Sequence, residues 1–236
     1  WSLPDFDSTS ENTQLRIDDL QITASEILPL SNSTVISITK TSNAQPNGYT
    51  YPVAIEVPTG ISSAMPVAIL LHGRGGNGNG SINQFRNTLD NHILVAPSGY
   101  LKCWNITEEP SDLPDIEFLR ELIAEIKTFP NVDSTRIRIV GTSNGAGLTN
   151  RVFVEIDDPG IDVICPIVSQ LHTGNYRNGN FYRPSNEQNT GAAFGENKGY
   201  DTQKIPASGR RILAISNLND GTIPYSGGPK FGSDFI

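Results

Sequence analysis

A serine with a glycine two residues away on either side lies near the middle of the chain. Gly141, Ser143 and Gly145 form the pattern G-x-S-x-G; a run rich in β-branched residues precedes it, and small, helix-compatible residues follow. A turn from strand to helix is too sharp here for flanking side chains, so glycines let it close and the serine hydroxyl stands at its tip. The helix would direct N–H groups and its positive end at an oxyanion beside the serine. The pattern predicts a nucleophilic serine, but such a short motif also arises by chance and needs further support.

A glycine-rich turn, HGRGG at 72–76, follows the first strongly apolar run. Glycines let the backbone approach a substrate carbonyl, so the N–H of Arg74 or Gly73, with that of Asn144, would bind the oxyanion. The rival interpretation is a phosphate-binding loop, but the G-K-[ST] ending and the dinucleotide-binding spacing are missing. We expect the side chain of His72 to brace the turn rather than to react.

The candidate acid is Asp220, which follows an apolar strand at 212–215. Its place after Ser143 agrees with the order serine then acid that is found when the nucleophile lies on such an elbow. The alternative is that Asn219, Asp220 and Gly221 only form a turn, to which these residue types are suited. The aligned strand and the Pro-Tyr pair that follows favour the catalytic interpretation.

Strands and helices alternate along most of the chain. Alternating apolar residues at 15–57 predict antiparallel strands, and residues 1–14 an irregular polar arm. Continuous apolar runs predict buried strands at 65–71, 92–97, 163–168 and 212–215. One-faced patterns predict helices at 112–129 and 145–156. This order indicates an α/β domain over 15–236, with a mostly parallel central sheet, helices on both faces and antiparallel strands at the N-terminal edge.

The long connection at 173–209 is rich in Gly and Asn and carries several aromatic residues. Loops at the carboxyl ends of strands commonly shape a pocket, so Tyr176, Phe181 and Tyr182 are candidate substrate contacts. They could stack on an aryl acid or a sugar, or instead pack the loop against the core. A disordered surface insertion is the other interpretation of the segment.

Several blocks over about residues 50–230 give the chain a more specific resemblance. They are LHGRGG at 71–76, DIEFL at 115–119, VD at 132–133 with RI at 136–137, GTSNG at 141–145 and DGTIPYSGG at 220–228. In order and spacing they resemble the secreted esterase and polyhydroxyalkanoate-depolymerase-like branch of the α/β-hydrolases, which includes feruloyl and acetylxylan esterases. The resemblance implies a serine hydrolase acting on carboxylic esters without a cofactor, with Ser143 as nucleophile and Asp220 as triad acid.

The triad histidine is missing from its expected place. In this fold it follows the acid, yet the chain has only His72, His92 and His172, and none follows Asp220. His92 begins a strand, at the wrong end for chemistry. His172 follows the strand at 163–168 and could act as base, because geometry rather than order defines a triad; otherwise it lines the pocket. We expect the base to lie beyond Ile236, and the chain to lack the last strand and helix of the domain.

Composition restricts the partners. The formal net charge of −8 argues against nucleic acid and anionic membranes, and no apolar run is long enough to span a bilayer. We expect a monomer that binds an ester substrate, possibly linked to a polymer, with no metal and no cofactor.

Cys103 and Cys165 are either buried thiols or one disulfide. Sequons at Asn32 and Asn105 permit glycosylation, and the acidic balance suits a secreted, extracellular or periplasmic protein.

Three functions follow in order of preference. The first is an extracellular serine esterase that acts through an acyl-enzyme on aryl, acetyl or polyester substrates. The second is a non-catalytic binding protein of the same fold that lacks the histidine base and uses the aromatic loop to hold a polymer. The third is a serine peptidase of the same fold. Without a base, Ser143 would retain only the small part of the rate that the oxyanion site provides.

Overall fold

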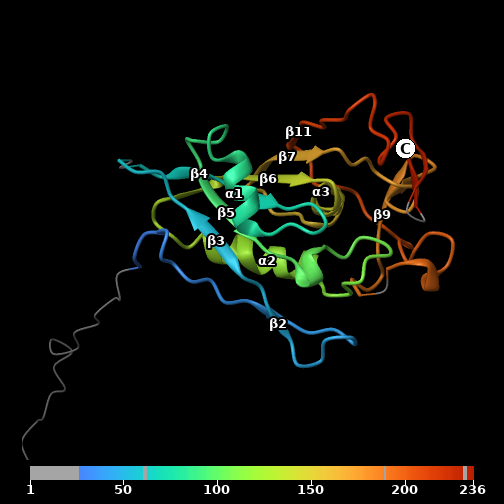
Figure 1. Ribbon diagram of the computed structural model, residues 1–236, viewed down its shortest axis with the longest axis horizontal. Coiled ribbons are helices and arrows are strands. Elements are labelled where there is room, and N and C mark those ends of the chain that lie inside the picture. The colour runs from blue at the N-terminus through green and yellow to red at the C-terminus, as the bar shows by residue number, and fades with distance from the viewer. Residues whose placement is uncertain (1–26, 61–62, 189, 231–232) are drawn as a thin grey trace, which may run out of the picture.

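The computed structural model describes residues 27–60, 63–188, 190–230 and 233–236 (Figure 1). The predicted arm at 1–14 and the first apolar positions after it lie outside the described residues. The remaining elements give an α/β architecture with one central sheet, as the sequence predicted.

The central sheet has six strands in the order β11-β7-β6-β4-β5-β3. Their bounds are β3 Val53–Glu56, β4 Met65–Leu71, β5 Ile93–Pro97, β6 Val132–Thr142, β7 Ile161–Ile167 and β11 Arg211–Ile212. All neighbouring pairs are parallel except β3 with β5, which confirms the mostly parallel sheet with an antiparallel N-terminal edge. The carboxyl ends of β4, β6 and β7 therefore meet at one edge of the sheet.

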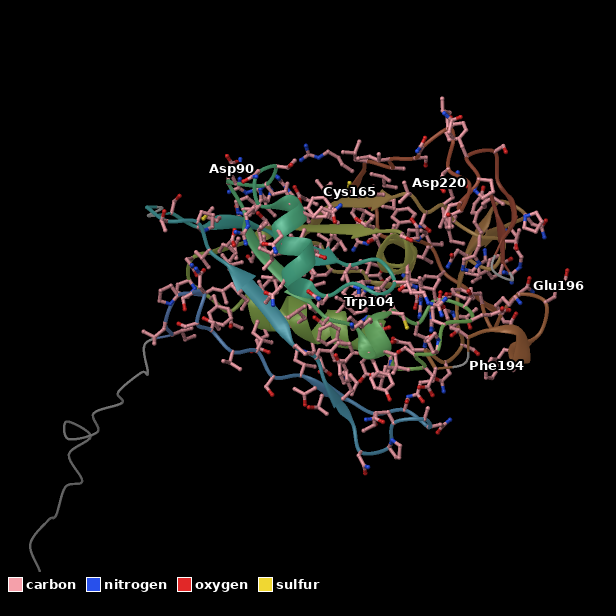
Figure 2. The ribbon with its side chains drawn as sticks, in the orientation of Figure 1. Asp90, Trp104, Cys165, Phe194, Glu196 and Asp220 are labelled. Carbon is pink, nitrogen blue, oxygen red and sulfur yellow. The ribbon has the colours of Figure 1, made fainter. Side chains whose placement is uncertain are left out.

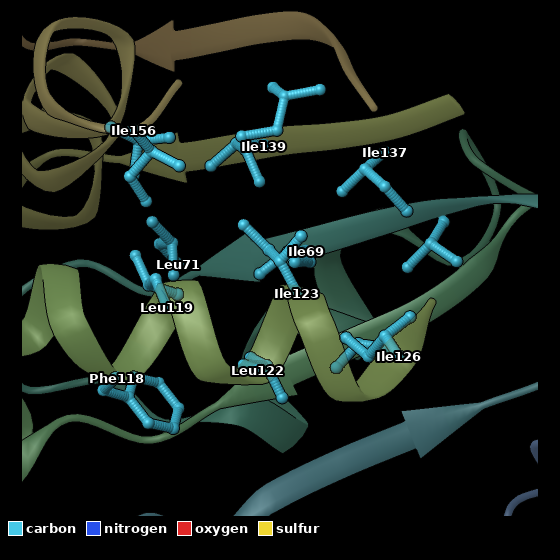
Figure 3. Close-up of a cluster of buried hydrophobic side chains, with 14 of the residues drawn as sticks. Ile69, Leu71, Phe118, Leu119, Leu122, Ile123, Ile126, Ile137, Ile139 and Ile156 are labelled. Atoms are coloured by element: carbon cyan, nitrogen blue, oxygen red, sulfur yellow. The ribbon is translucent and has the colours of Figure 1, made fainter. Parts of the chain in front are cut away.

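Helices cover both faces of this sheet, as predicted (Figure 1). The amphipathic helix α2 (Asp115–Ile126) and helix α3 (Asn144–Glu155) pack on one face, against alternate residues of the central strands. Figure 3 shows this cluster, in which Leu119, Leu122 and Ile123 of α2 lie under Ile69 and Leu71 of β4. Burial of these large aliphatic side chains supplies most of the driving force that fixes the sheet on its helices.

Helix α1 (Gly78–Phe85) covers the other face and was missed by the sequence analysis. Its sequence, GNGSINQF, has poor helix propensity, so tertiary contacts must hold it. Asn77 caps its N-terminus by accepting from the N–H of Gly80, and Ile82 enters the second apolar cluster. Gly78 is required because a Cβ there would lie 2.0 Å from the carbonyl oxygen of Ala96.

Smaller elements lie around the sheet. The run predicted at 15–57 forms only short strands where it is described: β1 (Thr39–Lys40) and β2 (Tyr49–Thr50) pair with each other, and only β3 joins the sheet. The connection at 173–209 folds into β8 (Tyr176–Arg177), β9 (Asn180–Arg183) and β10 (Thr202–Gln203) and contains the 3-10 turn Ala192–Phe194; a second 3-10 turn, Tyr100–Lys102, follows β5. Strands β12 (Gly228–Lys230) and β13 (Ser233–Phe235) form a hairpin. Among the described residues, every helix is too short or too polar to cross a bilayer.

Candidate active site

Ser143 lies at the tip of a sharp turn between β6 and α3. Its backbone angles are φ 52° and ψ −118°, a region that side-chain-bearing residues seldom adopt. Such a conformation costs about 1–3 kcal/mol and persists only where its surroundings enforce it. Here the Ser143 N–H donates to the carbonyl oxygen of Ile167 at 2.9 Å, which ties the turn to the end of β7. The serine is thus held in the strained geometry of a nucleophile elbow.

The two glycines of the pattern are explained by close backbone approach. A Cβ on Gly141 would lie 2.2 Å from the carbonyl oxygen of Gly145, across the turn. A Cβ on Gly145 would lie 2.2 Å from the carbonyl oxygen of Leu71, at the end of the neighbouring strand β4. Only glycine fits at either position, so the first turn of α3 sits directly against β4 and the glycine-rich turn that follows it.

That glycine-rich turn brings Gly73 and Arg74 beside the serine. A Cβ on Gly73 would lie 3.4 Å from the Cβ of Ser143, and Arg74 lines the same cavity as Ser143 and Asn144. Within the described part of the chain, the backbone N–H groups of Arg74 and Asn144 donate to no protein acceptor. Both N–H groups are therefore available to an oxyanion at the serine, the role that the sequence predicts for them.

His72 braces this turn, as expected. The N–H of Gly99 donates to its Nε2 at 2.9 Å, so the neutral ring carries its proton on Nδ1, which donates to the oxygen of Gly73 at 2.7 Å. Burial lowers the pKa of His72, which keeps this ring neutral. With both nitrogens engaged, His72 is a structural residue.

The side chain of Asn144 joins the elbow to the loop before α2. Its Oδ1 accepts from the N–H of Trp104 at 2.7 Å, and its Nδ2 donates to the Trp104 carbonyl and to Glu109 Oε1 at 3.2 and 3.1 Å. The other carboxylate oxygen of Glu109 accepts from the N–H groups of Ile106 and Thr107. These bonds fix the residue whose N–H is the second candidate oxyanion donor.

A cavity of about 390 Å³ opens at the serine. Its walls come from the glycine-rich turn, the elbow, the loop before α2, the segment after β7 and the Asp220 turn. The lining residues are Arg74, Ile106, Thr107, Glu108, Glu109, Ser143, Asn144, Gly147, Ser169, Gln170, His172, Thr222 and Ile223. This volume accommodates a small ester but only part of a polymer.

His172 shares this cavity with Ser143, but its hydrogen bonds do not match those of a triad base. Its Nδ1 accepts from the N–H of Gly174 at 3.1 Å, so this nitrogen cannot donate to a carboxylate at the same time. Burial first, then the charges of Arg151 and Lys198, lower the pKa of His172 to about 3. In this arrangement the ring is neutral and lacks the acid partner that orients a catalytic histidine.

Asp220 lies on a turn whose next residues line the cavity. Its Oδ1 accepts from the N–H groups of Ile223 and Thr222 at 2.9 and 2.7 Å, and these bonds lower the pKa of its carboxyl. No hydrogen bond joins Asp220 to any of the three histidines, all of which are described. Figure 2 shows Asp220 among the C-terminal loops, on the side where β7 ends. The turn interpretation is thus observed, and Thr222 and Ile223 of this turn line the cavity.

The remaining histidine and the three candidate aromatic residues lie away from the cavity. His92 directly precedes β5, at the amino end of the strand, as predicted. Tyr176, Phe181 and Tyr182 are not among the residues that line this cavity, and their contact with a substrate stays a prediction. Phe181 packs on Tyr176 and on Phe153 of α3, with ring centroids 4.8 and 5.5 Å away, while Tyr182 stacks on the Arg177 guanidinium. Phe181 thus packs the loop against α3, in agreement with the alternative left open by the sequence, while Tyr176 and Tyr182 contact residues of the loop itself.

The connection at 173–209 instead acts through residues that the sequence analysis did not single out. Tyr200 donates to the carbonyl oxygen of Ile106 at 2.6 Å, and Asn105 donates to the Glu187 carbonyl at 3.0 Å. Arg151 on α3 donates to the Asn105 carbonyl at 2.7 Å and forms a buried ion pair with Glu155. The loop thereby fixes the 105–109 wall of the cavity, and only the i, i+4 spacing of Arg151 and Glu155 was visible in the sequence.

The hydrogen bonds of Asn105 decide whether its sequon can carry a glycan, and the structure also shows the state of the two cysteines. Asn105 is 2% exposed and its amide is used inside the protein, so a glycan on this sequon is incompatible with the fold. Asn32 is exposed. Cys103 and Cys165 are buried free thiols, the first of the two alternatives. Among the described residues, no group of three or more His, Cys, Asp or Glu could hold a metal ion.

No protein-family model and no curated protein matches the chain. Among solved structures, a Bacillus cereus carboxylesterase matches with a TM-score of 0.51 at 16% identity, over 75% of this chain and 74% of that chain. A poly(3-hydroxybutyrate) depolymerase from Bordetella parapertussis matches at 18% identity (TM-score 0.44, 55% of this chain and 50% of that chain). An acetyl xylan esterase from Aspergillus awamori matches at 17% (TM-score 0.44, 54% and 50%), so this chain spans half the length of the latter two. The mostly parallel sheet and the likeness to the carboxylesterase show that the chain has the α/β-hydrolase fold.

Proposed function

We propose that the chain is a serine hydrolase of carboxylic esters that works through an acyl-enzyme. The observation that carries the proposal is Ser143 in the strained elbow, with the N–H groups of Arg74 and Asn144 free beside it. In this mechanism the Ser143 Oγ attacks the ester carbonyl, its proton passes to a general base, and the two N–H groups hold the tetrahedral oxyanion. The alcohol leaves, and water then releases the acid and frees the serine.

Covalent labelling by a fluorophosphonate tests this function, because the reagent phosphonylates an activated serine with loss of fluoride. We expect one label per chain, on Ser143 by peptide mass, and none on Ser143→Ala. Hydrolysis of p-nitrophenyl acetate should fall in parallel with labelling. A wild-type protein that folds, takes no label and hydrolyses no short acyl ester would refute the proposal. Comparing short acyl esters with matched amides separates an esterase from a peptidase of the same fold.

The second candidate is a non-catalytic binding protein, which the histidines favour. His72 uses both ring nitrogens in the turn, and the Nδ1 of His172 is occupied by the Gly174 N–H. Asp220 as triad acid and a base beyond Ile236 stay predictions from the sequence. The labelling experiment decides between the candidates, because a hydrolase-like binding protein would bind esters without phosphonylation of its serine.

The substrate class, the location and the oligomeric state of the protein are part of the same proposal. A small cavity with both polar and apolar walls suits aryl or acetyl esters, and a polyester would reach it only by a chain end. We propose an extracellular or periplasmic monomer that needs no cofactor. Secretion is tested by the location of the tagged protein after expression from its natural gene, and the monomer by light scattering.

A further inference from the structure

Gly147 and Ile106 meet on one wall of the cavity at Ser143. Both residues line this cavity and both are buried. Gly147 lies one helical turn after Ser143 on α3, and its N–H donates to the Ser143 carbonyl oxygen at 3.0 Å. Ile106 belongs to the loop before α2. This part of the wall is thus a contact between the backbone of the nucleophile helix and one isoleucine side chain.

The contact requires glycine on the helix. Outside α3 itself, the three atoms nearest to a Cβ on Gly147 would all belong to Ile106: Cδ1 at 2.4 Å, Cγ1 at 3.4 Å and Cγ2 at 3.5 Å. An ordinary contact between carbon atoms has a length of about 3.5–4.0 Å, so only the first of these distances is far too short. Any side chain at this position of the helix would therefore collide with a single methyl group, the δ-methyl of Ile106.

Neither backbone can move away from such a collision. The N–H of Ile106 donates to Glu109 Oε2 at 3.1 Å, and the carbonyl oxygen of Ile106 accepts from Tyr200 at 2.6 Å. Helix α3 is fixed in turn, because Gly145 lies directly against the carbonyl oxygen of Leu71. Since the rest of the interior is packed, the empty space beside the displaced methyl group is the cavity itself.

We propose that Gly147 is a specificity determinant: it keeps the δ-methyl of Ile106 against α3 and so leaves room in the cavity for a substrate group larger than acetyl. This inference rests on the proposed ester hydrolysis at Ser143. It narrows the substrate class to esters with an aryl or medium-length alkyl group on the acyl or the alcohol side. The cavity volume of about 390 Å³ supports this class, because pockets of about 300–1,000 Å³ hold drug-sized ligands.

A double-mutant cycle on substrate preference tests the proposal. The measured quantities are the hexanoate-to-acetate ratio of kcat/KM for p-nitrophenyl esters and the hexyl-to-methyl ratio for acetate esters. Gly147→Ala should lower at least one ratio by about tenfold, the lower limit of what one methylene is worth in an apolar pocket. Ile106→Val removes the δ-methyl and retains both γ carbons. In that background Gly147→Ala should change the ratio by only about twofold or less, because the colliding atom is gone.

Gly80→Ala is the control, since Gly80 lies in helix α1 and does not line the cavity. This variant should keep both ratios at their wild-type values. Ratios that Gly147→Ala leaves unchanged, or lowers equally with and without Ile106→Val, would overturn the proposal. If Gly147→Ala does not fold, Ile106→Val by itself decides: it should raise at least one ratio, and two unchanged ratios refute the inference.

A binding measurement separates this inference from the proposed function. In protein labelled with ¹³C at the isoleucine δ-methyl groups, the signal of Ile106 is the one that Ile106→Val removes. We expect millimolar 2-hexanone to move this signal, and Gly147→Ala to weaken the binding of 2-hexanone by about tenfold without weakening that of acetone. This result in a protein whose serine takes no label refutes the esterase alone. An Ile106 signal that 2-hexanone does not move, or equal weakening for both ketones, contradicts the inference even if Ser143 is labelled.

Discussion

Replacing Gly145 with alanine is the most direct test of how the elbow is held. The new Cβ would lie 2.2 Å from the Leu71 carbonyl oxygen and 2.6 Å from that of His72. Both contacts are to backbone atoms, which cannot rotate away as the end of a side chain can. To reach an ordinary contact distance, the start of α3 must move away from β4 by about 1 Å, carrying Ser143 away from Gly73.

The cost follows from two opposing terms. Overpacking of this kind destabilises a protein by about 1–3 kcal/mol, while alanine in a helix gains up to about 1 kcal/mol over glycine. We therefore expect a net loss of about 1–2 kcal/mol in the free energy of unfolding, measured by urea denaturation. A 1 Å misplacement of the nucleophile should also slow fluorophosphonate labelling of Ser143 by about 100-fold.

Gly80→Ala is the matched control, since Gly80 also lies in a helix but its added Cβ would contact only the Asn77 side chain, at 3.6 Å. The free energy of unfolding of this variant should be about 0.5–1 kcal/mol higher than that of the wild type, and the fluorophosphonate should label its Ser143 at the wild-type rate. If Gly145→Ala is as stable as Gly80→Ala and reacts as fast as the wild type, close approach of α3 to β4 does not position the serine.

Three further predictions concern buried polar groups. Burial, opposed by the hydrogen bond from Tyr51, raises the pKa of Asp115 to about 7. The protonated Asp115 side chain therefore stabilises the fold fully below about pH 4, and this contribution is lost as the pH rises through 7. Asp115→Asn should flatten the free energy of unfolding, measured by urea denaturation, over this pH range. Arg151→Met leaves the Glu155 charge buried without its partner and should cost about 3–5 kcal/mol, part of which Glu155→Gln recovers in the double variant. Tyr200→Phe removes one buried hydrogen bond and should cost about 1 kcal/mol by the same assay.

The sequence predicted the elements whose signals are local. The elbow is recognisable because Gly141 and Gly145 meet backbone atoms within the same turn or at the end of the adjacent strand. Helix α2 was predicted because its apolar positions repeat on one face, which is the face buried against β4. Helix α1 was missed because its glycines and asparagines oppose helix formation, and its stability comes from Asn77 and from packing of Ile82 on the sheet.

The candidate site was predictable only in part. Ser143 and the glycine-rich turn share the cavity because parallel strands place their carboxyl ends at one edge, a consequence of topology that the strand order implied. No comparable rule predicts from the sequence which way a loop side chain points. Phe181 turns toward α3, and the hydrogen bond of His172 to Gly174 depends on a loop conformation that carries no periodic signal.

The long connection at 173–209 therefore influences the cavity without lining it. Tyr200 meets the cavity wall twice, through its hydroxyl on the Ile106 carbonyl and through its ring against His172. Lys198 pairs with Glu108 on the same wall. Because packed interiors transmit displacements rather than absorb them, a change in this loop should move both the 105–109 wall and the His172 side chain. Substrate preference among proteins with this elbow can then change through loop residues that never touch the substrate, while Ser143 and its oxyanion donors remain in place.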